Sequence, residues 1–326
     1  MVSQPLDWKG RRRLQTRVAG APLSGAEAEI REARQALAYE VQTAYLELLL
    51  ARELVALNES LATTATQFRE AAQKRFDVGD VPRVEVDRAS LEAARADKEL
   101  LKSRSEARIR EAELDEFLGR DATSPTALAD KLEFRPIETK EKELIVQALE
   151  QRPEIRAAQA ELRARESEVR LAGADRLPDL SVQGKRNSVR SDGRNAVMLV
   201  LSVPLFDQGA LRGEASALTS DAAEQAALCR ELERRIRLQV VTPLAHVQQA
   251  RASVERYERE LVPQTEQVTQ TIQRGFDAGA STMLDVLEAQ RTLRSVQTEY
   301  RQAIADYLKA VVELNHATGA TRSEGE

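Results

Sequence analysis

The side chains that most often carry chemistry in proteins are few in this chain, and they form no catalytic arrangement. The two histidines, His246 and His316, lie far apart, and neither is near a cysteine or in an HxxxH spacing. A metal site needs several ligands at close spacing, so we interpret both as ordinary helical residues. Cys229 is the only cysteine, which excludes an internal disulfide and a cysteine-based zinc site. No nucleophile lies beside a base and no glycine-rich phosphate loop occurs, so we expect no enzyme activity, cofactor or metal centre.

Two carboxylates are the best candidates for chemistry of another kind. Asp285 and Glu288 are three residues apart, so on a helix they share one face. Grouped carboxylates attract cations and repel anions. Taken alone, the pair is interpreted as two solvated surface acids, which is the usual fate of such residues. A binding role depends on the elements that position them.

These carboxylates follow a turn sequence that occurs twice. Residues 74–86 read KRFDVGDVPRVEV and residues 274–286 read RGFDAGASTMLDV. Five identities are separated by 200 positions, and they pair Phe76 with Phe276, Asp77 with Asp277, Gly79 with Gly279, Val86 with Val286 and Ala89 with Ala289. Upstream, SQPLDWKG at 3–10 resembles SVPLFDQG at 202–209. The chain therefore contains one structural unit twice.

The sequence between these matches has the pattern of a helix with two packed faces. Apolar residues recur at spacings of four and three, at Leu37, Val41, Ala44, Leu48, Ala51 and Val55. A second stripe follows Leu46, Leu50, Leu54, Leu57 and Leu61. Two apolar stripes on one helix indicate a neighbour on each side, as in a ring of helices.

The helices on the amino-terminal side of the turns are expected to be very long. The first spans about residues 10–76, up to roughly 100 Å at 1.5 Å per residue. Its counterpart at 209–276 contains Pro243 and Pro263, each of which should kink it or be absorbed by curvature. Helices this extended cannot surround a core of their own, so partners should bury their remaining apolar surface.

The turns should be followed by shorter helices. Gly79 and Gly279 are expected to end the long helices, because glycine readily adopts the left-handed conformation of a helix C-terminus. Shorter helices should then span about 82–118 and 282–316. These pairs form two helical hairpins.

Two stretches lack a helical pattern. Residues 120–142 are expected to form a loop with one short strand. In LPDLSVQGKR, Leu180 and Val182 alternate with polar residues, and the apolar AVMLVLSVPLF follows a polar turn. We predict a β-hairpin over 178–206, which must pair with further strands because one hairpin is marginally stable.

Composition agrees with long helices and excludes several classes of protein. Of the 326 residues 31% are charged and only 4% aromatic. The net charge of −5 is spread along the chain without a basic block, so we expect no nucleic-acid partner. The sequence contains no run of 18 or more apolar residues, so no transmembrane helix is predicted. The opening MVSQPLDWKGRRRLQ is not a signal peptide.

The order of these elements resembles the TolC-like outer-membrane efflux proteins. That order is a helix, the LPDLS strand, a loop, the LSVPLFDQG strand, a very long helix, the FDAG turn and the LDVLEAQ helix. Similar pieces also occur at 151–181 and 261–279. The resemblance covers nearly the whole chain, and the opening QPLDWKGRRR is similar to the CzcC-like metal-efflux branch.

The resemblance implies a mainly α fold with an internal two-fold repeat. Very long antiparallel helices would form a trimeric α-barrel, and each protomer would contribute β-strands to a shared transmembrane β-barrel. Protomers must join because a sheet edge cannot stay unpaired in a bilayer. Alternation would direct one set of side chains to lipid, namely Leu180, Val182, Val197, Leu199, Leu201 and Val203. The opposite set, Ser181, Gln183 and Lys185, would face a water-filled lumen.

We place the first repeat at residues 1–142 and the second at 143–326. The first contains a strand remnant (1–8), a long helical hairpin (10–118) and an equatorial segment (119–142). The second contains a helix (143–173), the β-hairpin (178–206), a helical hairpin (209–316) and a polar tail. The first repeat lacks a helix, a strand and a signal peptide that the resemblance implies, so we interpret the chain as truncated at its amino terminus.

The resemblance also implies a gate at the turns, which in the family form the periplasmic tip of a tapering barrel. Asp285 and Glu288 match positions of an acidic ring to which each of three protomers contributes. Glu85 matches an acidic residue of a closed-state latch, although Ser281 stands where the partner arginine is usual. Phe276 matches a gate aromatic without its hydroxyl, and a plain core aromatic would look the same.

The tip residues Gly79, Asp80, Gly279 and Ala280 match the region that contacts the periplasmic adaptor (membrane fusion) protein. Gly79 and Gly279 would end their helices whether or not they contact an adaptor. The resemblance further implies a homotrimer, an inner-membrane pump such as an RND transporter, and contact with outer-membrane lipid. The complete protein would lie in the cell outer membrane and extend into the periplasm.

Two functions remain open from the sequence. The first is the exit duct of a tripartite efflux system, which conducts small molecules or metal ions passively through a gated trimeric tunnel. The second is a cytosolic coiled-coil scaffold with no transport role. The hairpin at 178–206 favours the duct, since a scaffold has no use for two amphipathic strands.

Overall fold

The structure is a computed structural model that describes residues 2–120, 126–186, 195–203 and 209–320. It divides into two compact units, each built from two parts of the chain. The strand unit comprises Met1–Gln35 and Ile145–Leu238, and the hairpin unit comprises Ala36–Leu144 and Gln239–Glu326. The division into repeats at residue 142 is a separate, sequence-based proposal, since each unit draws on both repeats.

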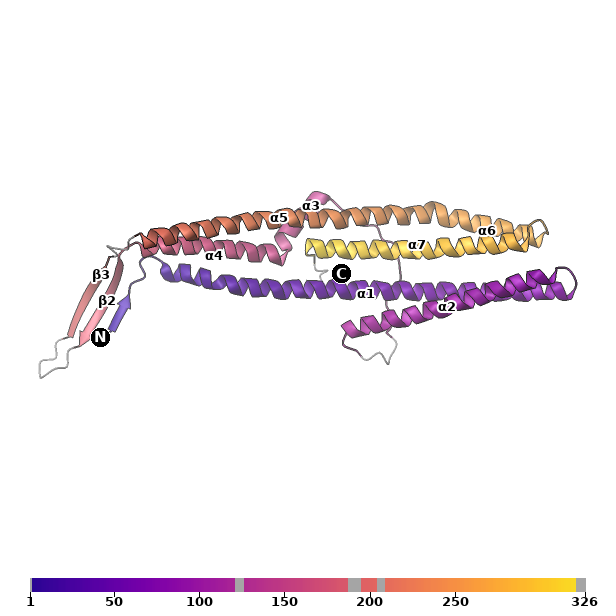
Figure 1. Cartoon of the computed structure of the whole chain (residues 1–326), viewed down its shortest axis with the longest axis horizontal. Helices are drawn as coiled ribbons and strands as arrows, with labels where there is room; N and C mark the ends of the chain where they lie inside the picture. The colour runs from indigo at the N-terminus through magenta and orange to yellow at the C-terminus, as the bar shows by residue number, and fades with distance from the viewer. Residues whose placement is uncertain (1, 121–125, 187–194, 204–208, 321–326) are drawn as a thin grey trace. The chain divides into compact units, whose positions relative to one another are not determined.

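The strand unit contains a three-stranded antiparallel sheet in the order β1-β2-β3 (Figure 1). The strands are β1 (Val2–Pro5), β2 (Asp179–Arg186) and β3 (Asn195–Ser202). This confirms the two predicted strands of the hairpin, while its turn and residues 204–206 lie outside the described residues, and the additional strand comes from the start of the chain. Both outer strands, β1 and β3, leave an edge that no described strand covers.

The register gives the sheet one apolar and one mixed face. Leu180 pairs with Leu201 and Val182 with Leu199, so these four side chains share a face. Val197 continues this face, and it is 78% exposed. The predicted alternation is thus confirmed within the strands, while Val203 follows the end of β3. The apolar face is unburied in the protomer, which indicates an apolar surrounding.

The single helix predicted at 143–173 is interrupted in the structure, so that prediction was wrong. The structure has two helices there, α3 (Glu141–Gln151) and α4 (Pro153–Asp175). Arg152 between them is extended, with ψ of 130°, and Pro153 is the first residue of α4. Proline lacks an N–H and disfavours helical geometry in the residue before it, so it is well suited to the first position of a helix, and here α3 ends before Pro153 begins α4. The sequence RPE contained that signal.

The long helices appear as predicted, with one change of geometry. They are α1 (Arg11–Asp77) and α5 (Ala210–Arg256), which parts of both units share. Pro243 lies inside a continuous α5. Before Pro263, by contrast, a π-helix at Tyr257–Leu261 separates α5 from α6 (Val262–Asp277). A proline can be accommodated by such a local change in hydrogen bonding.

The hairpin unit contains the two predicted helical hairpins. A turn joins α1 to α2 (Arg83–Phe117), and a second joins α6 to α7 (Met283–Thr318) (Figure 1). Gly79 and Gly279 have φ of 79° and 77°, the left-handed conformation expected of glycine at a helix end. The two turns share a backbone bond in which the glycine N–H donates to the carbonyl of Phe76 or Phe276.

Both apolar stripes of α1 are buried in its middle. Leu48 is fully buried in a cluster with Ala44 and Leu114. Leu46 and Leu50 of the second stripe are buried too, whereas Leu37 at the start of the pattern is exposed. A helix with two buried stripes has neighbours on two sides, as predicted.

The equatorial segment differs from its prediction. Residues 126–140 contain neither helix nor strand, so the expected short strand is not found in this described part of the segment. Instead the segment is fixed to α7 by Tyr307, whose hydroxyl donates to the carbonyl of Arg135 at 3.1 Å and accepts from the N–H of Ile137 at 3.0 Å. Phe134 packs edge-on against the same ring. Contacts with the Tyr307 side chain, rather than pairing in a strand, therefore hold this segment in place.

No helix in the described ranges is both long and apolar enough to cross a membrane.

Candidate functional site

The two turns of the hairpin unit are held together by one small apolar cluster. Its buried members come from α1, α2 and α7, and they are Ala72, Val86, Ala89, Met283 and Leu287. Phe76 and Phe276 pack against this cluster from the two turns. Phe276, predicted as a gate residue or a core aromatic, is partly buried here. The structure thus brings the two copies of the repeated turn into contact.

Arg75 connects the first turn to the second. Its guanidinium lies 5.0 Å from the centre of the Phe276 ring, within cation–π range. Its Nε also donates to Asp80 Oδ2 at 2.6 Å. In the second turn the matching positions are Gly275 and Ala280, which cannot form this pair. Aligning the two turn sequences reveals this difference, although we did not single out Arg75 from the sequence.

Gly275 has a steric role instead. A Cβ added there would lie 2.5 Å from Ser281 Oγ, so a side chain at this position would require the Ser281 hydroxyl to move. The tip residues predicted to contact an adaptor, Gly79, Asp80, Gly279 and Ala280, are all exposed. The first tip thus carries an ion pair, and the second presents a compact backbone with no charge.

Asp285 has a local role that the sequence analysis missed. It is the third residue of α7, and its Oδ2 accepts hydrogen bonds from both the N–H and the hydroxyl of Thr282, each at 2.8 Å. The N–H of Asp285 donates to Thr282 Oγ1 in return, which completes a capping box. The spacing TxxD before an apolar run was the available signal. The bonds from Thr282 favour the charged form and lower the pKa of Asp285.

Asp285 and Glu288 occupy the exposed face of α7, as their spacing predicted. Val286, Leu287 and Ala289, between and beside them, are buried. Both carboxylates are therefore directed away from the apolar cluster, and Asp285 keeps one oxygen outside the capping box. The geometry leaves the pair available to bind cations, which is also true of ordinary surface acids.

Glu85 is half-buried in the first turn of α2. Its side chain forms no hydrogen bond or ion pair with any residue that the structure describes. The N–H of Ser281 donates to the carbonyl of Gly275 at 3.1 Å, within its own turn. A latch through Glu85 therefore stays a prediction.

A series of ion pairs joins α7 to the first helical hairpin, and the sequence analysis did not find it. Arg291 donates to Glu92 Oε2 at 2.7 Å, and Glu92 is only 7% exposed. Farther along α7, Arg301 lies 3.7 Å from Glu53 and Lys309 lies 2.8 Å from Glu47. In all three pairs the cation is on α7 and the acid is on α1 or α2. We call this series the α7 ladder.

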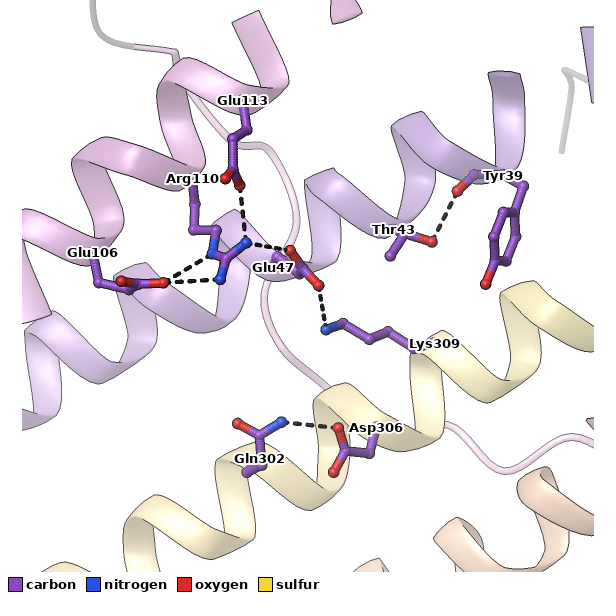
Figure 2. Close-up of polar contacts among 9 residues, drawn as sticks. All are labelled: Tyr39, Thr43, Glu47, Glu106, Arg110, Glu113, Gln302, Asp306 and Lys309. Carbon is purple, nitrogen blue, oxygen red and sulfur yellow. Dashed lines mark hydrogen bonds and ion pairs between the residues drawn. The ribbon is translucent and has the colours of Figure 1, made fainter. Parts of the chain in front are cut away.

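Glu47 of the ladder contacts cations on two other helices (Figure 2). One carboxylate oxygen accepts from Lys309 of α7 and the other accepts from Arg110 of α2, at 2.8 and 2.9 Å. Arg110 also donates to Glu106 and Glu113, so one half-buried acid joins three helices. Removing one member of such a network leaves its partners with an uncompensated charge, which costs more than losing a surface pair.

A buried polar cluster fixes the start of the described equatorial segment. Glu111 Oε1 accepts from the N–H of Thr126 at 2.8 Å and from Arg52 at 2.9 Å. The hydroxyl of Thr126 donates to Asp115, which is almost fully buried. The Thr126 N–H above all, then Arg108 and Arg52, lower the pKa of Glu111 despite its burial.

The histidines and the cysteine have structural partners. His246 Nδ1 lies 3.1 Å from Glu313 Oε2, at a groove of about 650 Å³ within the hairpin unit. His316 stacks on Tyr39, and the Cys229 thiol contacts the carbonyl of Ala158. Across the described ranges, no group of three or more His, Cys, Asp and Glu residues is arranged to hold a metal ion.

Comparisons with known proteins agree with this architecture. The cobalt-zinc-cadmium resistance protein CzcC of Cupriavidus metallidurans is 26% identical over 97% of this chain and 75% of its own length. The outer membrane protein TolC of Vibrio cholerae is 27% identical over 90% of this chain and 70% of its own. Two solved structures share the fold.

The outer membrane protein VceC of Vibrio cholerae has a TM-score of 0.70 at 21% identity, over 97% of this chain and 78% of its own. The CusC structure has a TM-score of 0.74 at 18% identity, and the match covers 98% of this chain and 76% of the CusC chain. The family model described as outer membrane efflux protein matches residues 1–120 and 144–320. The chain therefore belongs to the outer membrane efflux protein family.

Proposed function

We propose that three copies of this chain form the exit duct of a tripartite efflux system. The duct spans the outer membrane, extends into the periplasm, and lets cargo pass without a chemical step. A periplasmic adaptor docks at the helical turns, and an inner-membrane pump delivers the cargo. The family match over nearly the whole chain is the observation that carries this proposal.

The open sheet edges support the trimer. β1 and β3 each have an edge that no described strand covers, and one face of the sheet is apolar and exposed. Copies that pair these edges would satisfy the backbone hydrogen bonds that a bilayer requires. A cytosolic scaffold would leave both the edges and the apolar face in water, so we do not adopt that alternative.

The exposed carboxylates of α7 support a cation-attracting gate. Three protomers would bring three copies of Asp285 and Glu288 together where the tunnel narrows. Because Asp285 also caps α7, its carboxylate is held at a fixed position relative to the turn. Rings of acidic side chains at a constriction are a common basis of cation selectivity in channels.

The carboxylates of Asp285 and Glu288 also bear on which cargo the duct can carry. The Cupriavidus relative is named for resistance to cobalt, zinc and cadmium. An acidic constriction lets divalent metal cations approach, so we include metal ions with small molecules as cargo. The duct receives what its pump delivers, and its own residues set the charge preference rather than the identity of the cargo.

Single-channel recording on the full-length chain in planar bilayers tests the gate. The double variant Asp285→Asn and Glu288→Gln keeps an acceptor for Thr282 but removes both charges. We expect the divalent-cation concentration for half-block to rise about tenfold or more. The control variant Glu258→Gln and Glu260→Gln removes two exposed charges from the π-helix. Equal block in all three proteins would contradict the gate assignment.

A further inference from the structure

Exposed arginines gather where the strands of the strand unit meet its helices. Arg12 and Arg13 lie in the first turn of α1, and Arg176 directly follows α4. All three side chains are exposed, and none forms a hydrogen bond or ion pair with a residue in the described ranges. Arg11 of α1 pairs with Asp175 of α4, so the two segments touch. We call Arg12, Arg13 and Arg176 the basic collar.

The acids near the basic collar are already engaged. Asp7 accepts hydrogen bonds from the N–H groups of Arg11 and Arg12, at 2.7 and 3.1 Å. Asp179 accepts from Lys9 at 3.0 Å and from Arg11 at 3.1 Å. From Trp8 to Ala26 the sequence contains no acid. Within the part of the chain that the structure describes, the collar charges are therefore not neutralised by neighbouring acids.

Helix stability does not account for these arginines. The amino-terminal end of a helix carries a partial positive charge and favours acids in its first turn. The first turn of α1 contains three arginines and no acid. The Asp7 carboxylate caps the helix start, but it does not balance the three guanidinium charges, and a negatively charged partner at the collar would reduce their repulsion.

The surface next to the collar has the character of a membrane boundary. Leu6 donates its N–H to the carbonyl of Leu180 at 2.9 Å, so it continues the sheet with its apolar face. Leu6 is 43% exposed and Trp8 54% exposed. Tryptophan concentrates at membrane interfaces, between acyl chains and headgroups. Along the chain the order is thus a strand paired to the apolar-faced hairpin, then tryptophan, then arginine.

We propose that the basic collar binds the anionic headgroups of phospholipids in the periplasmic leaflet of the outer membrane. Guanidinium groups donate paired hydrogen bonds to phosphate oxygens, and the adjacent sheet sets the collar at headgroup depth. This inference rests on the outer-membrane location within the proposed function, but not on conduction. The collar would anchor the start of α1 at the membrane surface and fix the depth of the duct.

Trp8 makes the proposal measurable because it is the only tryptophan in the chain. The full-length protein is reconstituted in vesicles of phosphatidylcholine and phosphatidylglycerol, with bromine on the acyl chains of one lipid or the other. Bromine quenches a nearby tryptophan. At equal mole fractions we expect brominated phosphatidylglycerol to quench Trp8 at least about twofold more strongly than brominated phosphatidylcholine.

Matched variants separate charge from structure. Replacing Arg12, Arg13 and Arg176 with Gln should abolish the preference, and replacing all three with Lys should retain it. The control Arg31→Gln and Arg34→Gln removes exposed charges farther along α1 and should change nothing. Equal quenching by the two lipids in the unchanged protein would overturn the proposal, as would loss of the preference in both collar variants.

Two further measurements identify the ligand and separate a failure of the collar proposal from a failure of the proposed function. Excess inorganic phosphate at constant ionic strength should leave the preference intact, and its loss would mean a free-phosphate site instead. Conductance is recorded from the same vesicles. A conducting protein without lipid preference contradicts the collar alone, whereas a lipid preference without conductance contradicts the duct alone.

Discussion

Several residues at the turns carry two roles at once. Asp285 is both a cap of α7 and one of the exposed carboxylates proposed for the gate. Phe276 packs in the core that joins the turns and also accepts the Arg75 guanidinium over its ring. At this scale stability and function are coupled, so a substitution must preserve hydrogen bonding if only charge is to be tested. The Asp285→Asn change was chosen for that reason.

The Glu92–Arg291 pair of the α7 ladder should be the strongest of its ion pairs. Replacing Glu92 with Gln removes the charge that Arg291 contacts twice, from a side chain that is almost buried. We expect the free energy of unfolding to fall by about 1–3 kcal/mol, because Arg291 itself is partly exposed and solvent screens the pair. Chemical denaturation of the hairpin unit within the full chain measures this change.

The matched control for Glu92 is Asp87→Asn, on the same helix. Asp87 pairs with Arg83 at 3.3 Å, but both side chains are well exposed. An exposed pair of this kind contributes under about 1 kcal/mol. If both substitutions cost the same, the α7 ladder is a set of surface pairs and does not hold the hairpins together.

At the scale of elements, replacing glycine with alanine should change stability in opposite directions at the turns and inside α1. Gly79→Ala and Gly279→Ala place a Cβ at a positive φ, which should cost about 1–2 kcal/mol each. Gly20→Ala lies inside α1 with open space around it, and should stabilise by about 0.5–1 kcal/mol. Thermal unfolding followed by circular dichroism measures all three. A neutral result at both turns would mean that the left-handed turn geometry is not maintained.

The equatorial segment makes a prediction about pH. The N–H of Thr126 and the nearby arginines lower the pKa of Glu111 from its ordinary value of 4.5. Glu111 therefore contributes stability that is fully present above the ordinary pKa and is lost as the pH falls through the lowered one. Glu111→Gln should cost about 1–2 kcal/mol at neutral pH, and the difference from the unchanged protein should shrink on acidification.

The control for Glu111 is Glu116→Gln. Glu116 is exposed on the same helix, and its side chain has no hydrogen bond or ion pair with any residue that the structure describes. Denaturation at several pH values should show no pH-dependent difference for this variant. A constant difference for Glu111→Gln down to strongly acidic pH would contradict the assigned cause.

Elements with a repeated local signal could be predicted from the sequence, and those set by distant contacts could not. The long helices, both turns and the β2–β3 hairpin follow from apolar spacing, glycine and alternation. The break at Arg152 was missed, although Pro153 marked it. The loop at 126–140 was predicted, but the absence of its expected short strand could not be, because this part of the chain is fixed by Tyr307, more than 160 residues away.

The candidate site was predictable to a similar degree. The spacing of Asp285 and Glu288 placed them on one exposed face. Pairs such as Arg291 with Glu92 and Lys309 with Glu47 could not be found, since nothing in the local sequence indicates which acid a distant cation will contact. Whether these residues act as a gate remains a proposal.

At the scale of the whole molecule, the protomer is incomplete by itself. Among the described residues its sheet has edges that no strand covers and an exposed apolar face, and its helices leave large apolar side chains exposed. Association of identical copies and insertion into a bilayer resolve both features. In the proposed trimer the duct is therefore a property of the assembly, while each protomer supplies the tip, the α7 ladder and the basic collar.

Current through the reconstituted full-length chain in a planar lipid bilayer tests this account most directly. Insertion is verified beforehand by co-flotation of the protein with vesicles of the same lipid. The account predicts discrete conductance steps that prefer cations, with the preference reduced in the Asp285→Asn and Glu288→Gln variant. Inserted protein that carries no current above the bare membrane, or current with no charge preference in either protein, would contradict it.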